Sequence, residues 1–345
     1  RKQASVALAR QLVSRSELVF GEDAASIELA ALLAASSMQL QPTFDGDRVI
    51  RRPLSLLPKT RSTLPHGGPV TAVAFSPDGK WVATGSYDRS ARVMEAATGK
   101  EVSRLAHQET VSAVAFSPDG KWLATGSADK TARVMEAATS KEISRLAHQD
   151  TVYAVAFSPD GKWLATGSKD KTARVMEAAT GKGISRLAHQ DTVYAVAFSP
   201  DGKWLATGSA DKTARVIEAA TGREVYHLAH QGWVAEVAFS PDGKWLATGS
   251  SDKTARVMEA ATGTEVYRLA HQGWVAEVAF SPDSRWVATR SADYTLRVMD
   301  AATGEELHRI QIDPARIIDA ATDLVLTRHP RSEEHTSELQ SRQYL

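Results

Sequence analysis

The stretch Val193-Tyr-Ala-Val-Ala-Phe-Ser-Pro-Asp-Gly-Lys-Trp204 decides the fold, because close copies of it occur six times along the chain. Its Ser-Pro-Asp element recurs every 41 residues, beginning at Ser76, Ser117, Ser158, Ser199, Ser240 and Ser281. A period of this length is typical of a solenoid, a propeller or another repeat array. The six units extend from His66 to Gln311 of the 345 residues, so the repeat determines most of the structure.

Each unit predicts four short strands separated by turns. In the unit that starts at His148, the predicted strands are Val152–Phe157, Trp163–Ser168, Ala173–Glu177 and Ile184–Leu187. Strands at this spacing form an antiparallel sheet. Their apolar residues lie on both faces, so each sheet must be covered on both sides, and a ring of similar blades provides that cover. We therefore predict an all-β fold, a β-propeller of at least six blades that close into one ring.

These residues resemble the WD-repeat β-propeller family. The likeness rests on Leu187-Ala-His189, on the stretch from Val193 to Trp204, and on Asp211-Lys-Thr-Ala-Arg-Val216. The units depart from the family at the Trp-Asp pair, which is replaced by Met94-Glu95, Met135-Glu136, Met176-Glu177, Ile217-Glu218, Met258-Glu259 and Met299-Asp300.

The resemblance implies a buried hydrogen-bonded network in each blade, built from a His, an Asp, a Ser or Thr and the family's Trp. The His and Asp are present in all six units, as His66/Asp88, His107/Asp129, His148/Asp170, His189/Asp211, His230/Asp252 and His271/Asp293. Without the Trp we expect a shorter network. A His with an Asp could also form a catalytic dyad or a metal site, but recurrence in every unit favours a structural role. One arginine also recurs in every unit and could suggest a phosphate or anion site, but this recurrence again favours a structural role. These arginines are Arg92, Arg133, Arg174, Arg215, Arg256 and Arg297.

Composition excludes several classes of function. Lysine plus arginine and aspartate plus glutamate each number 41, so the net charge is zero, which argues against a nucleic-acid binder. The absence of cysteine excludes disulfides, Cys-ligated zinc and a cysteine nucleophile. No phosphate-binding loop, zinc-protease motif or serine-hydrolase motif occurs, so we expect no catalysis, cofactor or metal. The most apolar stretch, Ile27–Leu40, is too short and too polar to span a bilayer.

The ends of the chain differ from the repeats. Helical spacing of apolar residues predicts a helical lead-in over residues 1–58, followed by the propeller over 59–311. A C-terminal helical tail is predicted over 312–330, although Ala315–Thr322 also resembles the third strand and turn of a blade. Residues 331–345 resemble a translated sequencing adapter and are excluded from functional reasoning. Both Arg61–Leu64 and Glu305–Ile310 resemble fourth strands, which leaves the closure of the ring ambiguous.

The helical lead-in resembles the segment that precedes propellers in bacterial signal-transducing ATPases with numerous domains, although a small helical cap is an alternative. The resemblance implies an upstream ATPase or effector domain and a cytoplasmic location. The chain begins with Arg1 and shows no signal peptide, so we expect a piece of a longer protein.

Positions that vary between units are candidates for recognition. One variable set lies just after the His, and the other lies just before the turn Asp. In the family both regions lie on the top rim, where partners bind. The candidate partner-binding residues are Tyr87, Tyr153, Lys169, Tyr194, Trp233, Glu236, Trp274 and Glu277. Aromatic residues with a few charges are typical of binding hot spots. Packing between blades is the alternative explanation for the aromatic residues.

The sequence therefore predicts a non-catalytic propeller that binds a protein or peptide, as the sensor or scaffold part of a larger bacterial signalling protein. Neither nucleic acid nor membrane is an expected partner. A self-associating structural array is one alternative. An enzyme built on a propeller is another, but it would need a non-repeated polar cluster, which the repeats do not supply.

Overall fold

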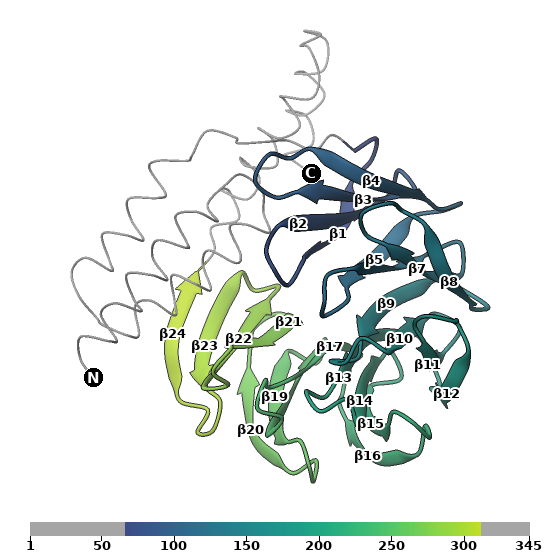
Figure 1. Ribbon diagram of the computed structural model, residues 1–345. Coiled ribbons are helices and arrows are strands. Elements are labelled where there is room, and N and C mark those ends of the chain that lie inside the picture. The colour runs from purple at the N-terminus through teal and green to yellow at the C-terminus, as the bar shows by residue number, and fades with distance from the viewer. Residues whose placement is uncertain (1–65, 312–345) are drawn as a thin grey trace, which may run out of the picture.

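The computed structural model describes residues 66–311, which form 24 strands in six four-stranded antiparallel sheets and contain no helix. Each sheet is one blade, made of four consecutive strands, so that blade 1 is β1–β4 and blade 6 is β21–β24 (Figure 1). The first strands are β1 (Val70–Phe75), β5 (Val111–Phe116), β9 (Val152–Phe157), β13 (Val193–Phe198), β17 (Val234–Phe239) and β21 (Val275–Phe280). The second strands are β2 (Trp81–Ser86), β6 (Trp122–Ser127), β10 (Trp163–Ser168), β14 (Trp204–Ser209), β18 (Trp245–Ser250) and β22 (Trp286–Ser291).

The two remaining strands of each blade complete the sheet. The third strands are β3 (Ser90–Glu95), β7 (Thr131–Glu136), β11 (Thr172–Glu177), β15 (Thr213–Glu218), β19 (Thr254–Glu259) and β23 (Thr295–Asp300). The fourth strands are β4 (Glu101–Ala106), β8 (Glu142–Ala147), β12 (Gly183–Ala188), β16 (Glu224–Ala229), β20 (Glu265–Ala270) and β24 (Glu306–Gln311). The all-β, six-bladed propeller architecture predicted from the sequence is confirmed, with one sheet for each 41-residue unit.

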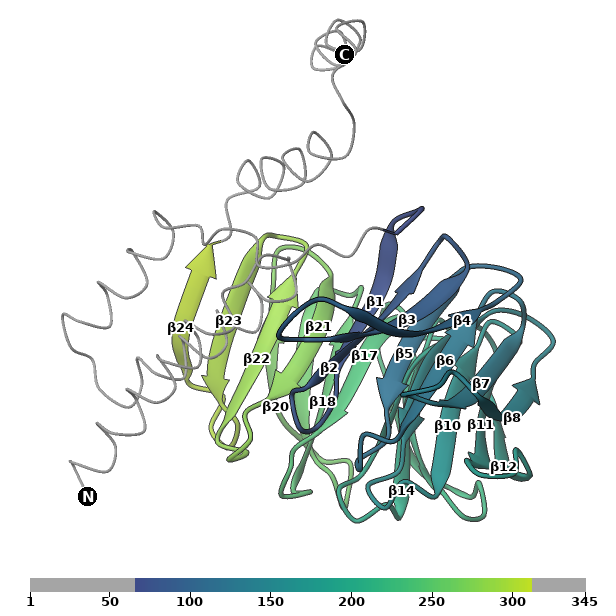
Figure 2. The same cartoon turned by 45° about the horizontal axis from the view of Figure 1, so that its top comes forward.

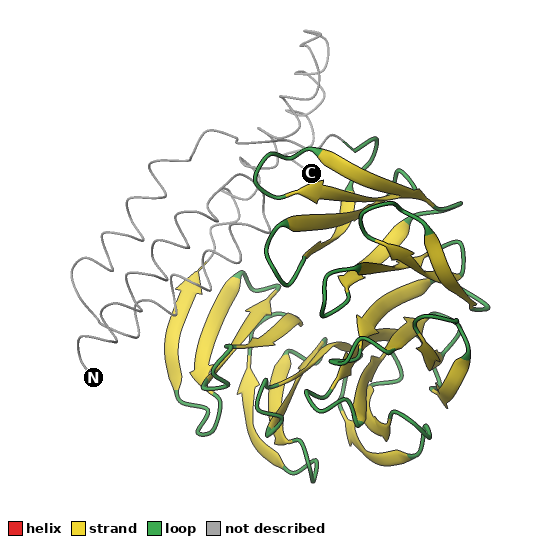
Figure 3. Cartoon of the chain, in the orientation of Figure 1, coloured by secondary structure: helices red, strands yellow, loops and turns green. Residues whose placement is uncertain are grey.

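The blades are arranged around a common centre (Figures 1 and 3), and Figure 2 shows the same arrangement turned by 45°. First strands of successive blades lie side by side, in the order β1, β5, β9, β13, β17 and β21. Among the described residues, β21 and β1, at the two ends of this series, do not pack on each other to this extent. How the ring closes, which the sequence left ambiguous, is therefore not settled by the described residues.

The Ser-Pro-Asp-Gly turn joins the first and second strands of a blade by a small hydrogen-bonded network. In blade 4, the Ser199 hydroxyl donates to Asp201 at 2.6 Å and accepts the backbone N–H of Trp204 at 2.9 Å. Gly202 has a φ of +72°, a conformation that glycine adopts without strain. The repeated turn thus fixes where every second strand begins.

Apolar packing between blades forms the core. The first valine of β13, Val193, is fully buried and lies in one cluster with Ala165 and Val175 of the preceding blade. Met176 and Met135 are also fully buried, and they occupy the positions where the family has its tryptophan. A methionine side chain is flexible enough to fill the space that the larger ring would take.

β24 pairs with β23 as the fourth strand of blade 6, so Glu305–Ile310 rather than Arg61–Leu64 completes that sheet. The predictions for Arg61–Leu64, the lead-in 1–58, the tail 312–330 and the adapter 331–345 all lie outside the described residues. Within residues 66–311 no helix could cross a membrane.

Candidate functional site

Four aromatic side chains from four successive blades form a continuous ladder. The ring centroids of Tyr153 and Tyr194 are 5.5 Å apart, those of Tyr194 and Trp233 are 5.4 Å apart, and those of Trp233 and Trp274 are 5.3 Å apart. Neighbouring rings are tilted by 39–56°, which is within the range of favourable aromatic contacts. We call these four residues the aromatic ladder.

Each of blades 3 to 6 contributes one ring to the aromatic ladder, but the four rings come from two different positions of the repeat. Tyr153 and Tyr194 are the second residues of β9 and β13, whereas Trp233 and Trp274 directly precede β17 and β21. The pairing of β13 with β14 shifts register around Tyr194, which marks a β-bulge. A bulge re-aims the side chain beside it. Sequence analysis identified all four residues, but it did not show that the two positions supply one row of rings.

The ladder is packed and accessible at once. Trp233 and Trp274 remain 37% and 41% exposed, although each contacts a neighbouring ring. Tyr153 and Tyr194 are half-buried. Tyr87 is 61% exposed on blade 1 and makes none of the ring contacts found in residues 66–311. Of the five predicted aromatic residues, the structure thus brings four together and leaves one apart.

Charged groups lie beside the tyrosine end of the ladder. Burial raises the pKa of Tyr194, the neighbouring Tyr153 and Asp191 add to this effect, and Lys169 opposes it. The predicted Lys169 is exposed, so its ammonium is available to a ligand. Asp191, whose carboxylate accepts the backbone N–H of Thr192 at 2.7 Å, was not among the residues predicted from the sequence. The sequence does contain a signal for Asp191, because blades 3 and 4 share an Asp-Thr pair at the position where blades 5 and 6 have Gly-Trp.

The two predicted glutamates are not a pair of free carboxylates. Burial raises the pKa of Glu236 to about 8, and the nearby Glu277 adds to the shift, so the environment of Glu236 favours the neutral carboxyl group. Glu277 is exposed and forms a two-pronged ion pair with Arg290, at 2.6 and 3.1 Å. Burial is therefore the main cause of the raised pKa of Glu236, and repulsion by the Glu277 carboxylate is the smaller one.

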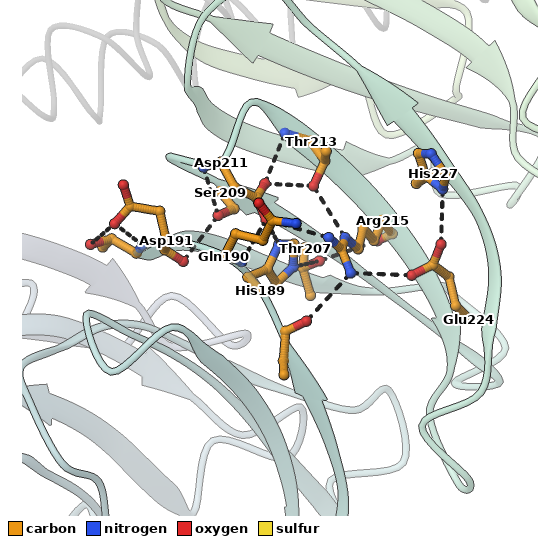
Figure 4. Close-up of polar contacts among 12 residues, drawn as sticks. His189, Gln190, Asp191, Thr207, Ser209, Asp211, Thr213, Arg215, Glu224 and His227 are labelled. Carbon is orange, nitrogen blue, oxygen red and sulfur yellow. Dashed lines mark hydrogen bonds and ion pairs between the residues drawn. The ribbon is translucent and has the colours of Figure 1, made fainter.

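The predicted histidines and aspartates meet in every blade, as the close-up of blade 4 shows (Figure 4). His189 Nδ1 lies 2.8 Å from Asp211, and its Nε2 lies 2.9 Å from the Thr207 hydroxyl. An ionised carboxylate only accepts hydrogen bonds, so Nδ1 carries the proton. Across the six blades the His–Asp distance is 2.8–3.3 Å and the His–Thr distance is 2.8–2.9 Å.

An arginine joins this network, which is therefore not the shorter one expected after loss of the Trp. Arg133 Nη2 donates to Asp129 at 2.9 Å, its Nε donates to Thr131, and its Nη1 donates to the Ala106 carbonyl of blade 1. In blades 2 to 5 the arginine thus links the Asp to the preceding blade. Its constant position, four residues after each Asp, was visible in the sequence.

Blade 6 has the weakest copy of the network. His271 Nδ1 is 3.3 Å from Asp293, the longest of the six distances. Arg297 still donates to the Ala270 carbonyl, but its buried Nε has no hydrogen-bond partner. A buried donor without a partner is destabilising, so this blade gains less from its network than the others.

The His–Asp network suits a structural role. All six histidine side chains are fully buried, so no substrate reaches them. Burial lowers the pKa of each histidine below 6.5, and the partner aspartate opposes this effect in every blade. At His271 the charge of Arg297 is the second-largest cause and lowers the pKa further. Residues 66–311 contain no group of three or more His, Asp or Glu that could hold a metal ion.

The fold, the 41-residue period and the His–Asp network together define a WD-repeat propeller. The family model described as WD domain, G-beta repeat matches six segments, which cover more than half of the chain: residues 58–94, 99–135, 140–176, 181–218, 222–258 and 263–300. The chain belongs to this family, whose propellers are typically non-catalytic domains that bind proteins or peptides. No curated protein matches the sequence.

Proposed function

We propose that this propeller captures a protein or peptide on the aromatic ladder without catalysing a reaction. The observation that carries the proposal is the row of four touching rings, which ends in two tryptophans that are 37% and 41% exposed. Tryptophan and tyrosine are the residues most enriched among binding hot spots. The tyrosine end, with Lys169 and Asp191 nearby, supplies charges that select and orient a ligand.

The same proposal extends to the larger protein. A propeller that holds a ligand on one rim suits the sensor or scaffold part of a cytoplasmic bacterial signalling protein, with an ATPase or effector domain upstream in the full chain. The helical pattern of residues 1–58 supports this assignment. Nucleic acid and membrane are not the expected ligands, because the chain has no net charge.

Peptide display against the folded protein tests the binding role. Peptides selected on the wild type are tested on Trp233→Ala/Trp274→Ala, and on Val225→Ala/Val266→Ala as the control. Val225 and Val266 are 39% and 41% exposed on the fourth strands of blades 4 and 5, so the control removes similarly exposed apolar groups away from the ladder. Binding that is lost only in the tryptophan variant supports the proposal. Equal binding by both variants contradicts it.

A further inference from the structure

In five of the six blades that the structure describes, a glutamate lies between two basic side chains. In blade 1, Arg104 of β4 donates to the Glu101 carboxylate through Nε and Nη2, both at 2.8 Å, and Nη1 of Arg92 on β3 lies 3.5 Å from the same carboxylate. Arg92 and Arg104 are direct cross-strand partners. Like charges in this position repel each other, so the carboxylate stabilises the pair.

Blades 2, 4, 5 and 6 repeat this arrangement with little change. In blades 2, 5 and 6 the fourth-strand arginine donates two hydrogen bonds of 2.7–3.0 Å to the glutamate. In blade 4, which Figure 4 shows, His227 replaces this arginine and its Nδ1 lies 2.9 Å from Glu224. Nη1 of the third-strand arginine lies 3.4–3.6 Å from the glutamate in all four blades. Each of these glutamates is the first residue of its fourth strand: Glu142, Glu224, Glu265 and Glu306.

Blade 3 keeps both arginines but lacks the glutamate. The first residue of β12 is Gly183, and Arg174 and Arg186 are direct partners across β11 and β12. Arg186 is exposed, and within residues 66–311 its guanidinium has no hydrogen-bond or ion-pair partner. Nη1 of Arg174 still donates to the Ala147 carbonyl at 3.0 Å. Two like charges therefore face each other without the carboxylate that separates them in the other blades.

The site on blade 3 is open and partly rigid. No atom lies within 4 Å of the position that a Cβ atom on Gly183 would take, so the space where the glutamate begins in other blades is accessible. Arg174 is held from behind, because its Nε donates to Thr172 and its Nη2 donates to Asp170, both at 3.1 Å. Its side chain is nevertheless 21% exposed, so a ligand can reach it.

The charges on blade 3 are not balanced as they are elsewhere. In blades 1, 2 and 5, an aspartate and a glutamate pair with the two arginines. In blade 3, Asp170 pairs with Arg174, and among the described residues no carboxylate pairs with Arg186. The site thus has one positive charge in excess. A guanidinium group recognises a carboxylate through two parallel hydrogen bonds, as the fourth-strand arginines of this chain do.

We propose that blade 3 binds a carboxylate side chain of an acidic peptide segment between Arg174 and Arg186, in the place that a glutamate of the chain takes in the other five blades. Arg186 donates to this carboxylate through Nε and Nη2, and Nη1 of Arg174 lies beside it. β12 is at the opposite edge of the sheet from β9, which carries Tyr153 of the aromatic ladder. The site is therefore separate from the ladder and does not depend on binding there.

NMR of the full chain tests the site, because the Nε–H resonance of Arg186 reports on its partner and is identified with Arg186→Lys. The probe is a glycine–serine peptide with blocked ends and a single glutamate, titrated at constant ionic strength. We expect a saturable shift of the Arg186 resonance with this peptide and none with the version that carries glutamine. In Gly183→Glu the carboxylate of the chain takes the site, so the peptide should bind about tenfold more weakly or worse. Gly183→Ala leaves the site open and should bind as the parent does.

Unfolding in urea gives a second measurement that needs no peptide. Relative to Gly183→Gln, which has the same size, Gly183→Glu is expected to lower the equilibrium constant of unfolding by about two- to fivefold. The difference should vanish when Arg186→Gln is added to both variants. Equal shifts with the glutamate and glutamine peptides, equal peptide binding by the parent and Gly183→Glu, or a Glu–Gln difference that persists without Arg186 would each overturn the proposal.

Discussion

The rings of Trp233 and Trp274 lie 5.3 Å apart, centroid to centroid, although 41 residues separate them in the sequence. Equivalent positions of neighbouring blades are side by side in a propeller, so a change repeated in two units produces two adjacent side chains. The repeat thus converts a few variable positions into a continuous surface. Blades 1 and 2 have no aromatic residue at these positions, so the row of rings does not continue onto them. The residues there are Pro69, Thr71, Thr110 and Ser112.

Loss of both tryptophans is expected to weaken ligand binding far more than it weakens the fold. Truncation of a hot-spot residue typically costs about 2 kcal/mol or more, which is about thirtyfold in affinity. Because the two rings also contact each other, we expect the free energy of unfolding to fall by about 0.5–1.5 kcal/mol beyond the loss of buried area.

A double-mutant cycle separates these two effects. Trp233→Ala, Trp274→Ala and the double variant are compared by denaturant unfolding and by titration with a selected peptide. Non-additive unfolding energies measure the contact between the rings. If the double variant is unfolded at room temperature, the ladder serves packing between blades, and its role in binding is rejected.

Replacement of a network histidine is expected to cost more in blade 4 than in blade 6. His189→Ala removes the ring whose nitrogens lie 2.8 Å from Asp211 and 2.9 Å from Thr207. We expect the free energy of unfolding to fall by about 1–3 kcal/mol. His271→Ala removes a longer bond of 3.3 Å from a network that already contains an unpartnered Arg297 Nε, so its loss is smaller. Chemical denaturation of the two variants measures the difference. Equal losses would show that the distances in blade 6 do not reflect bond strength.

Acidification is expected to destabilise the propeller in two stages. Burial lowers the pKa of the six histidines, so below pH 6.5 the unfolded chain binds protons that the folded chain does not. Their contribution to stability is complete above pH 6.5 and is lost as the pH falls toward the lowered values.

The aspartates act at lower pH. Burial opposes ionisation of Asp129, but hydrogen bonds from Thr131, His107 and Gln108 outweigh it and lower its pKa to about 2 from 3.8. Its contribution is therefore present above pH 3.8 and is lost between 3.8 and 2. Urea unfolding at pH 7.5, 5.5 and 3.5 checks the first stage and the start of the second. A free energy of unfolding that is constant from pH 7.5 to 5.5 would contradict neutral, buried histidines.

The sequence alone was sufficient to predict the blades, because each 41-residue unit carries four strand signals and its own turn residues. It also identified all four rings of the ladder and every His–Asp pair, since repetition separates positions that the fold requires from positions that vary. The role of the arginines was recognised only as structural, and their contact with the Asp became clear in the structure.

Other features depend on geometry that no local pattern contains. Tyr194 lies in a strand whereas Trp233 precedes one, and the contact between their rings does not follow from the spacing of residues in one unit. The pairing of Glu277 with Arg290 depends on strand register between β21 and β22. Arg290 stands where blades 1 to 5 have a glycine, and the close approach of a valine to that glycine is visible only in the structure.

The valine–glycine contact between blades predicts the effect of a single methyl group. In Gly126→Ala the new Cβ would lie 2.9 Å from Val152 Cγ1, 3.1 Å from the Val152 carbonyl oxygen and 3.2 Å from Val155 Cγ1. Two side chains and a backbone must therefore move to accept it, and overpacking of this kind typically costs about 1–3 kcal/mol.

Gly183→Ala is the matched control, because it adds the same methyl group to a strand of the neighbouring blade. No atom lies within 4 Å of its Cβ position, and its φ is not in the left-handed region. An alanine in an open strand position is expected to leave the free energy of unfolding unchanged or to raise it by up to about 1 kcal/mol. Denaturant unfolding of the two variants against the parent chain gives the comparison. If Gly126→Ala is as stable as Gly183→Ala, the blades do not interlock through this contact.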